Sequence, residues 1–260
     1  MKVAVIIPSR MNSSRFPGKP LKKILGYTMI EHCYKRACMS KDVDDVFVAT
    51  CDSEIKEHIE SIGGKVLITS SCHKRASTRT EEAIEILNNK YDLKYDFIIM
   101  LQGDEPLIRP DSITKMINDC KSNDLEILNL IAPIKSKEKF IDKNNVKVVF
   151  DKNMNALYFS REPIPSSWLE EESIENKFMQ IGVIGFSNAS LKKFNKLKES
   201  CLEKSESVDM NRVIENGYKI LLSPINYEMI GVDCTNDLNE AEKLMERDPT
   251  FDLYKDNILN

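Results

Sequence analysis

The chain has 260 residues, of which 42% are hydrophobic and 30% are charged, and its formal net charge is -4. This length fits one large α/β domain or two small ones, and the slightly negative charge argues against a general binder of nucleic acid or of membrane surfaces. No apolar run approaches the roughly 18 residues of a membrane span, and the N-terminus turns polar too early for a secretory signal, so we expect a cytoplasmic protein.

Apolar runs alternate with helical patterns along the first half of the chain. The apolar runs predict strands, and the intervening segments, with hydrophobic residues three and four positions apart, predict helices. We expect strands at residues 3–7, 46–50, 65–69 and 97–101, and helices at about 28–39, 54–62, 80–89 and from Pro110 onward. This alternation predicts a mixed, mainly parallel sheet flanked by helices.

The pattern changes at about residue 136. The segments VKVVF and ALYFS flank the polar turn DKNMN, which predicts a β-hairpin, and the strand MQIGVIGF follows. Helices are expected again at 189–198, at 208–216 before the capping Gly217, and at about 236–246. Two charged stretches, 196–205 and 242–256, are expected to be solvated helix faces.

The domain organisation follows from what the chain lacks. It contains no internal repeat, linker composition or low-complexity tract. We therefore predict a single domain over residues 1–260, with an antiparallel hairpin region inserted at about 136–186.

The seven cysteines are scattered and include no Cys-x-x-Cys pair. An odd, unpaired set argues against a disulfide framework and against a structural zinc site. None of the three histidines belongs to a recognisable nucleophile motif, which argues against a catalytic cysteine. Reduced thiols are the expected state.

Basic residues gather in the loop after the first predicted strand. Arg10, Arg15 and Lys19 lie in the segment PSRMNSSRFPGKP, which has no acidic residue. Ligands of open α/β sheets bind at the carboxyl ends of strands, and cations beside Ser- and Gly-rich backbone suit a polyphosphate. The loop predicts a phosphate site, with a solvated loop as the alternative. It is not a Walker A loop, because Pro20 follows Lys19.

Two aspartates predict a magnesium site. Asp104 follows the strand 97–101 in LQGDEPLI, and Asp233 lies in GVDCTND. Carboxylates from two distant segments suit a Mg²⁺ ion that keeps water and phosphate oxygens as its other ligands. The alternatives are an ordinary turn at Asp104 and a helix cap at Asp233.

The order of these motifs resembles that of the 3-deoxy-manno-octulosonate (Kdo) cytidylyltransferases, also called CMP-Kdo synthetases. The matching segments are PSRxxSSRxPGKPL, QGDEPLI, LYFSR, IENGYKI and GVDxxxDL, which together span essentially the whole chain. The resemblance implies a core like that of the nucleotide-diphospho-sugar transferases and a homodimer formed through the inserted hairpin region. It also implies that CTP and an acid sugar react to give a CMP-sugar and pyrophosphate, with Mg²⁺ as cofactor. The product would serve the biosynthesis of surface lipopolysaccharide.

The resemblance further implies roles for individual residues. The nucleotide would contact Pro8, Arg10, Arg15, Lys19, His73, Arg79, Gln102 and Gly103. The sugar would contact Arg161, Gln180, Ile184, Asp209 and Met210. Asp104 and Asp233 would hold Mg²⁺ and, with Arg10 and Lys19, form the catalytic set.

Several positions depart from the family segments HxSGT(D/E)R, HLGIYGY and LEQLR. The departures are Arg75, Ala76 and Thr78 in the first segment, Gln180 and Ile184 in the second, and Asp209 and Met210 in the third. The nucleotide half is retained while the acceptor half is changed, and a changed pocket suggests a changed sugar, so the expected acceptor is Kdo or a related acid. The alternatives are 8-amino-Kdo, a nonulosonic acid, or a catalytically silent nucleotide-binding homologue. The roles of Trp168 and of residues 74–78 stay open.

Overall fold

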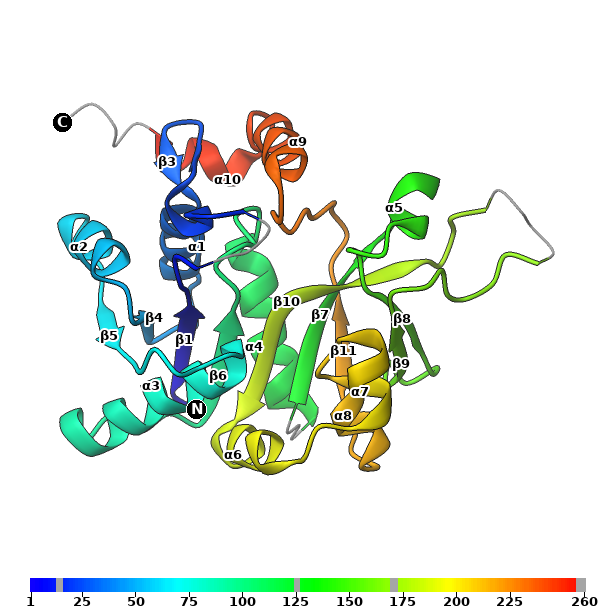
Figure 1. Ribbon diagram of the computed structural model, residues 1–260, viewed down its shortest axis with the longest axis horizontal. Coiled ribbons are helices and arrows are strands. Elements are labelled where there is room, and N and C mark those ends of the chain that lie inside the picture. Colours follow the sequence, from blue (N-terminus) through cyan, green and yellow to red (C-terminus); the bar gives the residue numbers. More distant parts are fainter. Residues whose placement is uncertain (13–15, 124–126, 169–172, 256–260) are drawn as a thin grey trace.

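The computed structural model describes residues 1–12, 16–123, 127–168 and 173–255. Within these residues, a nine-stranded sheet has the order β11-β7-β10-β6-β1-β4-β5, and β8 and β9 extend it from β10 (Figure 1). The strands are β1 (Val3–Pro8), β4 (Asp45–Thr50), β5 (Val66–Ile68), β6 (Phe97–Leu101), β7 (Ile127–Pro133), β8 (Lys147–Phe150), β9 (Ala156–Ser160), β10 (Phe178–Ser187) and β11 (Leu221–Pro224). A separate two-stranded sheet is formed by β2 (Lys23–Ile24) and β3 (Tyr27–Thr28).

Helices connect the strands and cover both faces of the sheet. They are the 3₁₀ turn η1 (Lys19–Leu21), α1 (Met29–Cys38), α2 (Ser53–Ser61), α3 (Ala76–Tyr91), α4 (Pro110–Asn123), α5 (Lys137–Ile141), α6 (Asn188–Lys196), α7 (Cys201–Glu206), α8 (Asn211–Glu215), α9 (Thr235–Met245) and α10 (Pro249–Asp252). In the described part of the chain, no helix is long and apolar enough to cross a bilayer.

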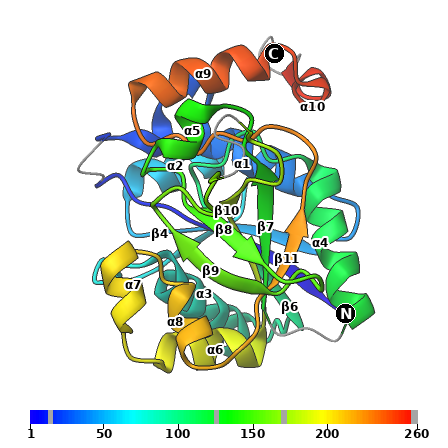
Figure 2. The same cartoon turned by 90° about the vertical axis from the view of Figure 1, so that its right-hand side faces the viewer.

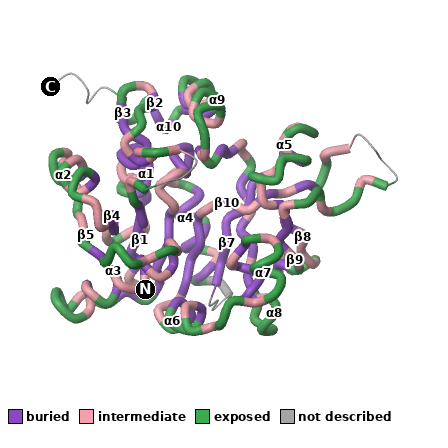
Figure 3. The backbone as a smooth tube through the Cα atoms, viewed as in Figure 1, coloured by how far each residue is buried: buried purple, intermediate pink, exposed green. Residues whose placement is uncertain are grey.

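The central strand β1 shows why the sheet is buried on both sides. It pairs in parallel with β4 and β6. Its side chains alternate: Val3, Val5 and Ile7 face a core shared with α1, α2 and α4, and Ala4 and Ile6 face a second core shared with α3 and α6. All five are fully buried, so the continuous apolar run is that of a strand with helices on both faces (Figure 3).

The strand β10 runs antiparallel to both β6 and β7 and separates the two parallel parts of the sheet. Its register with β7 shifts between Gln180 and Ile184, which marks a β-bulge. At its start β10 pairs with β8 of the hairpin, so the strand links the main sheet to the inserted region (Figure 2).

The predicted fold class is confirmed, and several boundaries move. The helix expected at 80–89 begins at Ala76, inside the segment that departs from the family pattern, and the helix expected at 208–216 shortens to α8. The strands β7 and β11 were not predicted from the sequence. They pair in parallel with each other, which local pattern alone does not specify.

The expectation that the two charged stretches are solvated is wrong at several positions. Glu203 is 1% exposed and accepts two hydrogen bonds from Arg212. Asp248 is 6% exposed and pairs with the buried Arg36 of α1, and Tyr254 packs beside that pair. These charges are buried because each has an opposite charge as its partner, which composition does not reveal.

Candidate active site

Two cavities adjoin at the carboxyl ends of β1 and β6. The larger has a volume of about 430 Å³ and the smaller of about 290 Å³. Gln102, Asp104 and Asp233 line both, so the two spaces meet at these residues. The order of the parallel strands reverses between β1 and β6, and this switch point is where open α/β sheets bind ligands.

The loop after β1 places Lys19 at the junction of the two cavities. Gly18 has φ 68°, a left-handed conformation that favours glycine, and turns the chain into η1. The Lys19 Nζ lies 2.6 Å from Asp104 Oδ2 and 2.9 Å from Asp233 Oδ1. Burial of this ammonium lowers the pKa of Lys19, but the two carboxylates outweigh that effect and the pKa is raised above its ordinary value.

Asp104 and Asp233 therefore face a common cation, although they come from remote parts of the chain. Asp233 does not cap α9, because the cap is Cys234, in a capping box with Asp237. Two convergent carboxylates are hard oxygen donors of the kind that Mg²⁺ takes. Among the described residues, no group of three or more His, Cys, Asp or Glu side chains is arranged to hold a metal ion. An ion at this place would thus need other ligands, such as water and substrate oxygens.

The smaller cavity collects the residues expected to contact the nucleotide. Its lining includes Pro8, Arg10, Lys19, His73, Arg79, Gln102 and Gly103. Arg15 lies outside the described residues. The Arg10 Nη1 donates to the carbonyl oxygen of His73 at 3.4 Å, which joins the loop after β1 to the segment before α3.

The His73 ring is held on both of its nitrogens. Nδ1 lies 3.0 Å from Thr78 Oγ1, and Nε2 contacts the Glu82 carboxylate. Arg79, which is buried, donates from Nη1 to Thr69 Oγ1. The start of α3 thereby fixes one wall of the smaller cavity.

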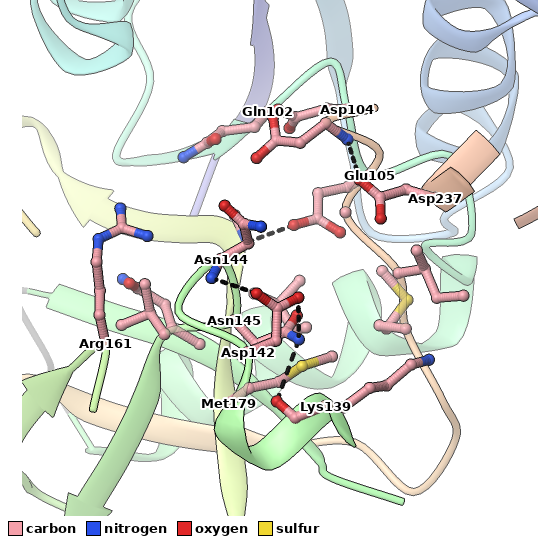
Figure 4. Close-up of a pocket in the computed structure, with 18 of the residues that line it drawn as sticks. Gln102, Asp104, Glu105, Lys139, Asp142, Asn144, Asn145, Arg161, Met179 and Asp237 are labelled. Atoms are coloured by element: carbon pink, nitrogen blue, oxygen red, sulfur yellow. Dashed lines mark hydrogen bonds between the residues drawn. The ribbon is translucent and has the colours of Figure 1, made fainter. Parts of the chain in front are cut away.

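The larger cavity collects four of the five residues expected to contact the sugar, namely Arg161, Gln180, Ile184 and Asp209. Figure 4 shows Arg161 in this lining. Met210 requires a correction. Its side chain is 0% exposed and packs in the second core, with α3 and α6, so it is not part of this lining. The turn that begins α8 points it inward, whereas the neighbouring Asp209 reaches the cavity.

The bulge of β10 shapes one wall of the larger cavity. Gln180 donates to Asn129 Oδ1 at 2.6 Å, and Asn129 donates to the carbonyl oxygens of Ile181 and Val183. A Cβ on Gly182 would lie 2.9 Å from the Gln102 side chain, so this position has no room for a larger residue. The bulge thus depends on glycine.

Glu105 is a buried carboxyl group that the sequence analysis did not single out. Its Oε1 accepts from the Gly182 backbone N–H at 2.7 Å, and Oε2 has no hydrogen-bond partner within the described structure. Burial, helped by the charge of Asp104, raises the pKa of Glu105 to about 8. The only sequence signal was its place beside Asp104 in QGDEP.

Arg75 connects the two cavities through α7. It lines the smaller cavity, and its Nη2 lies 2.6 Å from Glu199 Oε1 and 2.9 Å from Glu203 Oε1. Asp209 lines the larger cavity. Burial raises the pKa of Asp209, and the charge of Arg75 acts in the opposite direction.

This geometry can be set beside known proteins. The family model described as Cytidylyltransferase matches residues 4–220, a range that contains β1, β6 and the loops that follow them. The chain belongs to the cytidylyltransferase family. This confirms the resemblance inferred from the order of the motifs.

Curated relatives match this cytidylyltransferase over almost their full length. The 3-deoxy-manno-octulosonate cytidylyltransferase of Thermodesulfovibrio yellowstonii is 43% identical, with 94% of this chain and 98% of the relative covered. The 8-amino-3,8-dideoxy-manno-octulosonate cytidylyltransferase of Shewanella pealeana is 39% identical, with 93% and 98% covered. Relatives with two different acceptors are therefore similarly close.

A solved structure supports the same assignment. It is CMP:2-keto-3-deoxy-manno-octonic acid synthetase complexed with CTP, with a TM-score of 0.84, 32% identity, and coverage of 95% of this cytidylyltransferase and 99% of that chain. A putative glucose-1-phosphate thymidylyltransferase from Bacillus anthracis has a TM-score of 0.64 at 14% identity, which shows a shared fold alone.

Proposed function

We propose that this cytidylyltransferase transfers CMP from CTP to a 2-keto-3-deoxy sugar acid, Kdo or a close relative, with release of pyrophosphate. The observation that carries the proposal is the junction of two cavities at Gln102, Asp104 and Asp233. One cavity has the basic lining that a triphosphate needs, and the other is lined by Arg161 and polar side chains. Binding in adjoining cavities places the two reactants next to each other, which removes the entropic cost of bringing them together from solution.

The reaction is an in-line displacement at phosphorus. The anomeric hydroxyl oxygen of the acid forms a bond to the α-phosphorus, the bond from that phosphorus to the pyrophosphate oxygen breaks, and the hydroxyl proton passes to solvent water. Arg10 and Lys19 supply positive charge where negative charge develops, and Arg161 orients the acceptor carboxylate. When bound between Asp104 and Asp233, Mg²⁺ would supply further positive charge next to the phosphates.

The charges that line the larger cavity bear on which sugar acid is the acceptor. The carboxylates of Glu138, Asp142, Asp209 and Glu240 line the larger cavity, where the cations are Lys139 and Arg161. Lys139 is already paired with Glu228 and Glu240. An acceptor that carries an ammonium group, such as 8-amino-Kdo, is therefore the second candidate. Ranking kcat/KM for Kdo, 8-amino-Kdo and a nonulosonic acid with CTP distinguishes the candidates.

Replacement of one metal carboxylate tests the proposed site. In Asp104→Asn, pyrophosphate release from CTP and the acid should fall at least about 100-fold, because the charge that holds the cation is lost. Chelation of divalent ions should inactivate the unmodified protein, and added Mg²⁺ should restore it. Release is measured with a coupled phosphate assay.

A matched control is Asp111→Asn, which removes an exposed carboxylate from α4 that lines neither cavity. Its activity should match that of the unmodified protein. Turnover retained in a folded Asp104→Asn variant would remove the metal assignment. Absence of turnover with every acid in the unmodified protein would instead favour a silent homologue.

The setting of the enzyme is also part of the proposal. We infer a homodimer paired through the region at about 136–186, a cytoplasmic location, and a role in lipopolysaccharide biosynthesis. Support comes from the resemblance of the motifs to those of the Kdo cytidylyltransferases.

A further inference from the structure

Lys147, the first residue of β8, is a lysine whose side chain has no access to solvent. It is 0% exposed, and its Nζ donates to the backbone carbonyl oxygens of Asp142 at 2.9 Å, of Asn145 at 2.7 Å and of Arg161. An ammonium has three N–H donors, and here each has one acceptor. The lysine thus acts as a fixed link among three backbone positions.

These three positions belong to two different walls of the larger cavity. Asp142, Asn144 and Asn145 form the loop between α5 and β8, and Arg161 follows β9 (Figure 4). The Arg161 side chain also donates from Nη1 to the Lys143 carbonyl oxygen at 2.8 Å and from Nε to the Glu206 carbonyl oxygen at 2.7 Å. The Lys143 carbonyl that holds the guanidinium lies in the 142–145 loop, and Lys147 binds this loop at Asp142 and Asn145 and also binds the Arg161 backbone.

We propose that Lys147 is a positioning residue for the acceptor: without touching the sugar acid, it fixes Arg161 and the 142–145 loop in the arrangement that binds it. The inference rests on the proposed function and deepens it by naming what presets the acceptor cavity. Removal of the ammonium would leave the carbonyl oxygens of Asn145 and Arg161 without this donor, whereas that of Asp142 would keep the Asn145 backbone N–H at 3.2 Å. The loop and Arg161 would then move to find other partners.

The charges around Lys147 keep the link intact at neutral pH. Burial lowers the pKa of Lys147 to about 8, and the neighbouring Arg161 lowers it too, while Asp142, Glu162 and Glu206 favour the charged form. The three carbonyl oxygens also stabilise the ammonium rather than the neutral amine, which has only two N–H donors. Below pH 8 the lysine is charged and all three bonds form.

Lys147→Met tests the inference, and the same chain offers a matched control. Lys177 is also buried and also donates to backbone carbonyl oxygens, those of Pro165 and Ser166, but these residues line neither cavity. We expect Lys147→Met to raise the KM for the sugar acid at least about tenfold while the KM for CTP stays within about twofold. Lys177→Met should leave both within about twofold.

A second variant keeps the test decisive if Lys147→Met does not fold. Lys147→Arg retains a cation and several N–H donors, so it should restore most of the acceptor affinity. The acceptor KM of the unmodified protein should rise between pH 8 and pH 9.5, as Lys147 loses its proton, and that of Lys147→Arg should stay flat. The folded state is not destabilised by this deprotonation, because its Lys147 has the lower pKa.

The outcomes separate this inference from the proposed function. If no sugar acid is activated by the unmodified protein, the proposed function fails. If the acid is activated but Lys147→Met changes the two KM values equally or not at all, Lys147 does not position the acceptor. The same conclusion follows if Lys177→Met raises the acceptor KM as much as Lys147→Met does.

Discussion

Arg75 makes ion pairs that hold one cavity wall to the other. It contacts Glu199 and Glu203, and Glu203 also accepts two hydrogen bonds from Arg212. The residues that follow α7, from Ser207 to Asp209, line the larger cavity. The Glu203 carboxylate thus links Arg75, on the nucleotide side, to the helix that precedes the acceptor-side residues.

The first prediction at this scale concerns Arg75→Ser. The variant removes the ion pairs to Glu199 and Glu203 at the start of α7, and it removes a charge that lowers the pKa of Asp209. The ratio of kcat/KM for Kdo to that for 8-amino-Kdo should change at least about fivefold, and the KM for CTP less than about twofold. A steady-state assay with both acids at fixed CTP measures this.

Lys74→Ser is the comparison variant, because Lys74 also lines the smaller cavity. Loss of this cation should weaken CTP binding and leave the acid preference unchanged. An unchanged acid preference in Arg75→Ser would show that the ion pairs only support the local fold.

The surroundings of the Lys147 and Glu105 side chains could not be predicted from the sequence. In VKVVF the lysine fits an alternating strand with one solvated face, and no local pattern tells that three carbonyl oxygens surround it. Glu105 lies in a turn-rich segment, and its burial depends on Gly182 of β10. Asp104 and Asp233, by contrast, were recognisable because each belongs to a motif.

At the scale of elements, the strands with both faces buried were the most predictable. β1 and β6 are continuous apolar runs, which predicts strands that are covered on both faces, as the structure has them. β11 has four residues, and it pairs with β7, an element distant in sequence. The β10 bulge contacts Asn129 of β7 and Gln102, which follows β6, so strand propensity alone cannot reveal it.

The hairpin region exposes several large apolar side chains. Trp168 is 87% exposed, Leu157 of β9 is 56% exposed and Ile141 at the end of α5 is 57% exposed. Figure 1 shows α5, β8 and β9 together on one side of the molecule. If two copies pair through this region, sedimentation equilibrium of the unmodified protein gives about twice the chain mass of 29.8 kDa.

The combined change Leu157→Ser and Trp168→Ser should shift this equilibrium toward the monomer, because it removes exposed apolar side chains from the paired surface. Leu253, 71% exposed beyond α10, provides the control, and Leu253→Ser should not alter the mass. A monomeric unmodified protein would refute pairing. A Leu157→Ser/Trp168→Ser variant that stays dimeric would place the interface elsewhere.

The last described segment of the chain packs on the helix α1. His32 of α1 lies against Tyr254: Nδ1 is 2.6 Å from the Tyr254 hydroxyl oxygen, and Nε2 is 2.8 Å from the Ile24 carbonyl oxygen. A carbonyl only accepts, so Nε2 carries the proton, and Nδ1 accepts from Tyr254. Burial lowers the pKa of His32, so the ring is neutral and its unprotonated Nδ1 accepts from the Tyr254 hydroxyl group. The many charged residues near the C-terminus had predicted a solvated surface and not this buried contact.

The last prediction follows from that neutral ring. Burial lowers the pKa of His32 to about 4 from an ordinary 6.5. Between these values the unfolded chain binds a proton that the folded protein does not, so this contribution is complete above pH 6.5 and is lost as the pH falls toward 4. The full loss is about 3 kcal/mol. Urea unfolding at pH 7 and pH 4.5 should show a smaller difference in unfolding free energy for His32→Gln, whose amide does not titrate, than for the unmodified protein. Equal differences in the two proteins would mean that His32 does not govern acid stability.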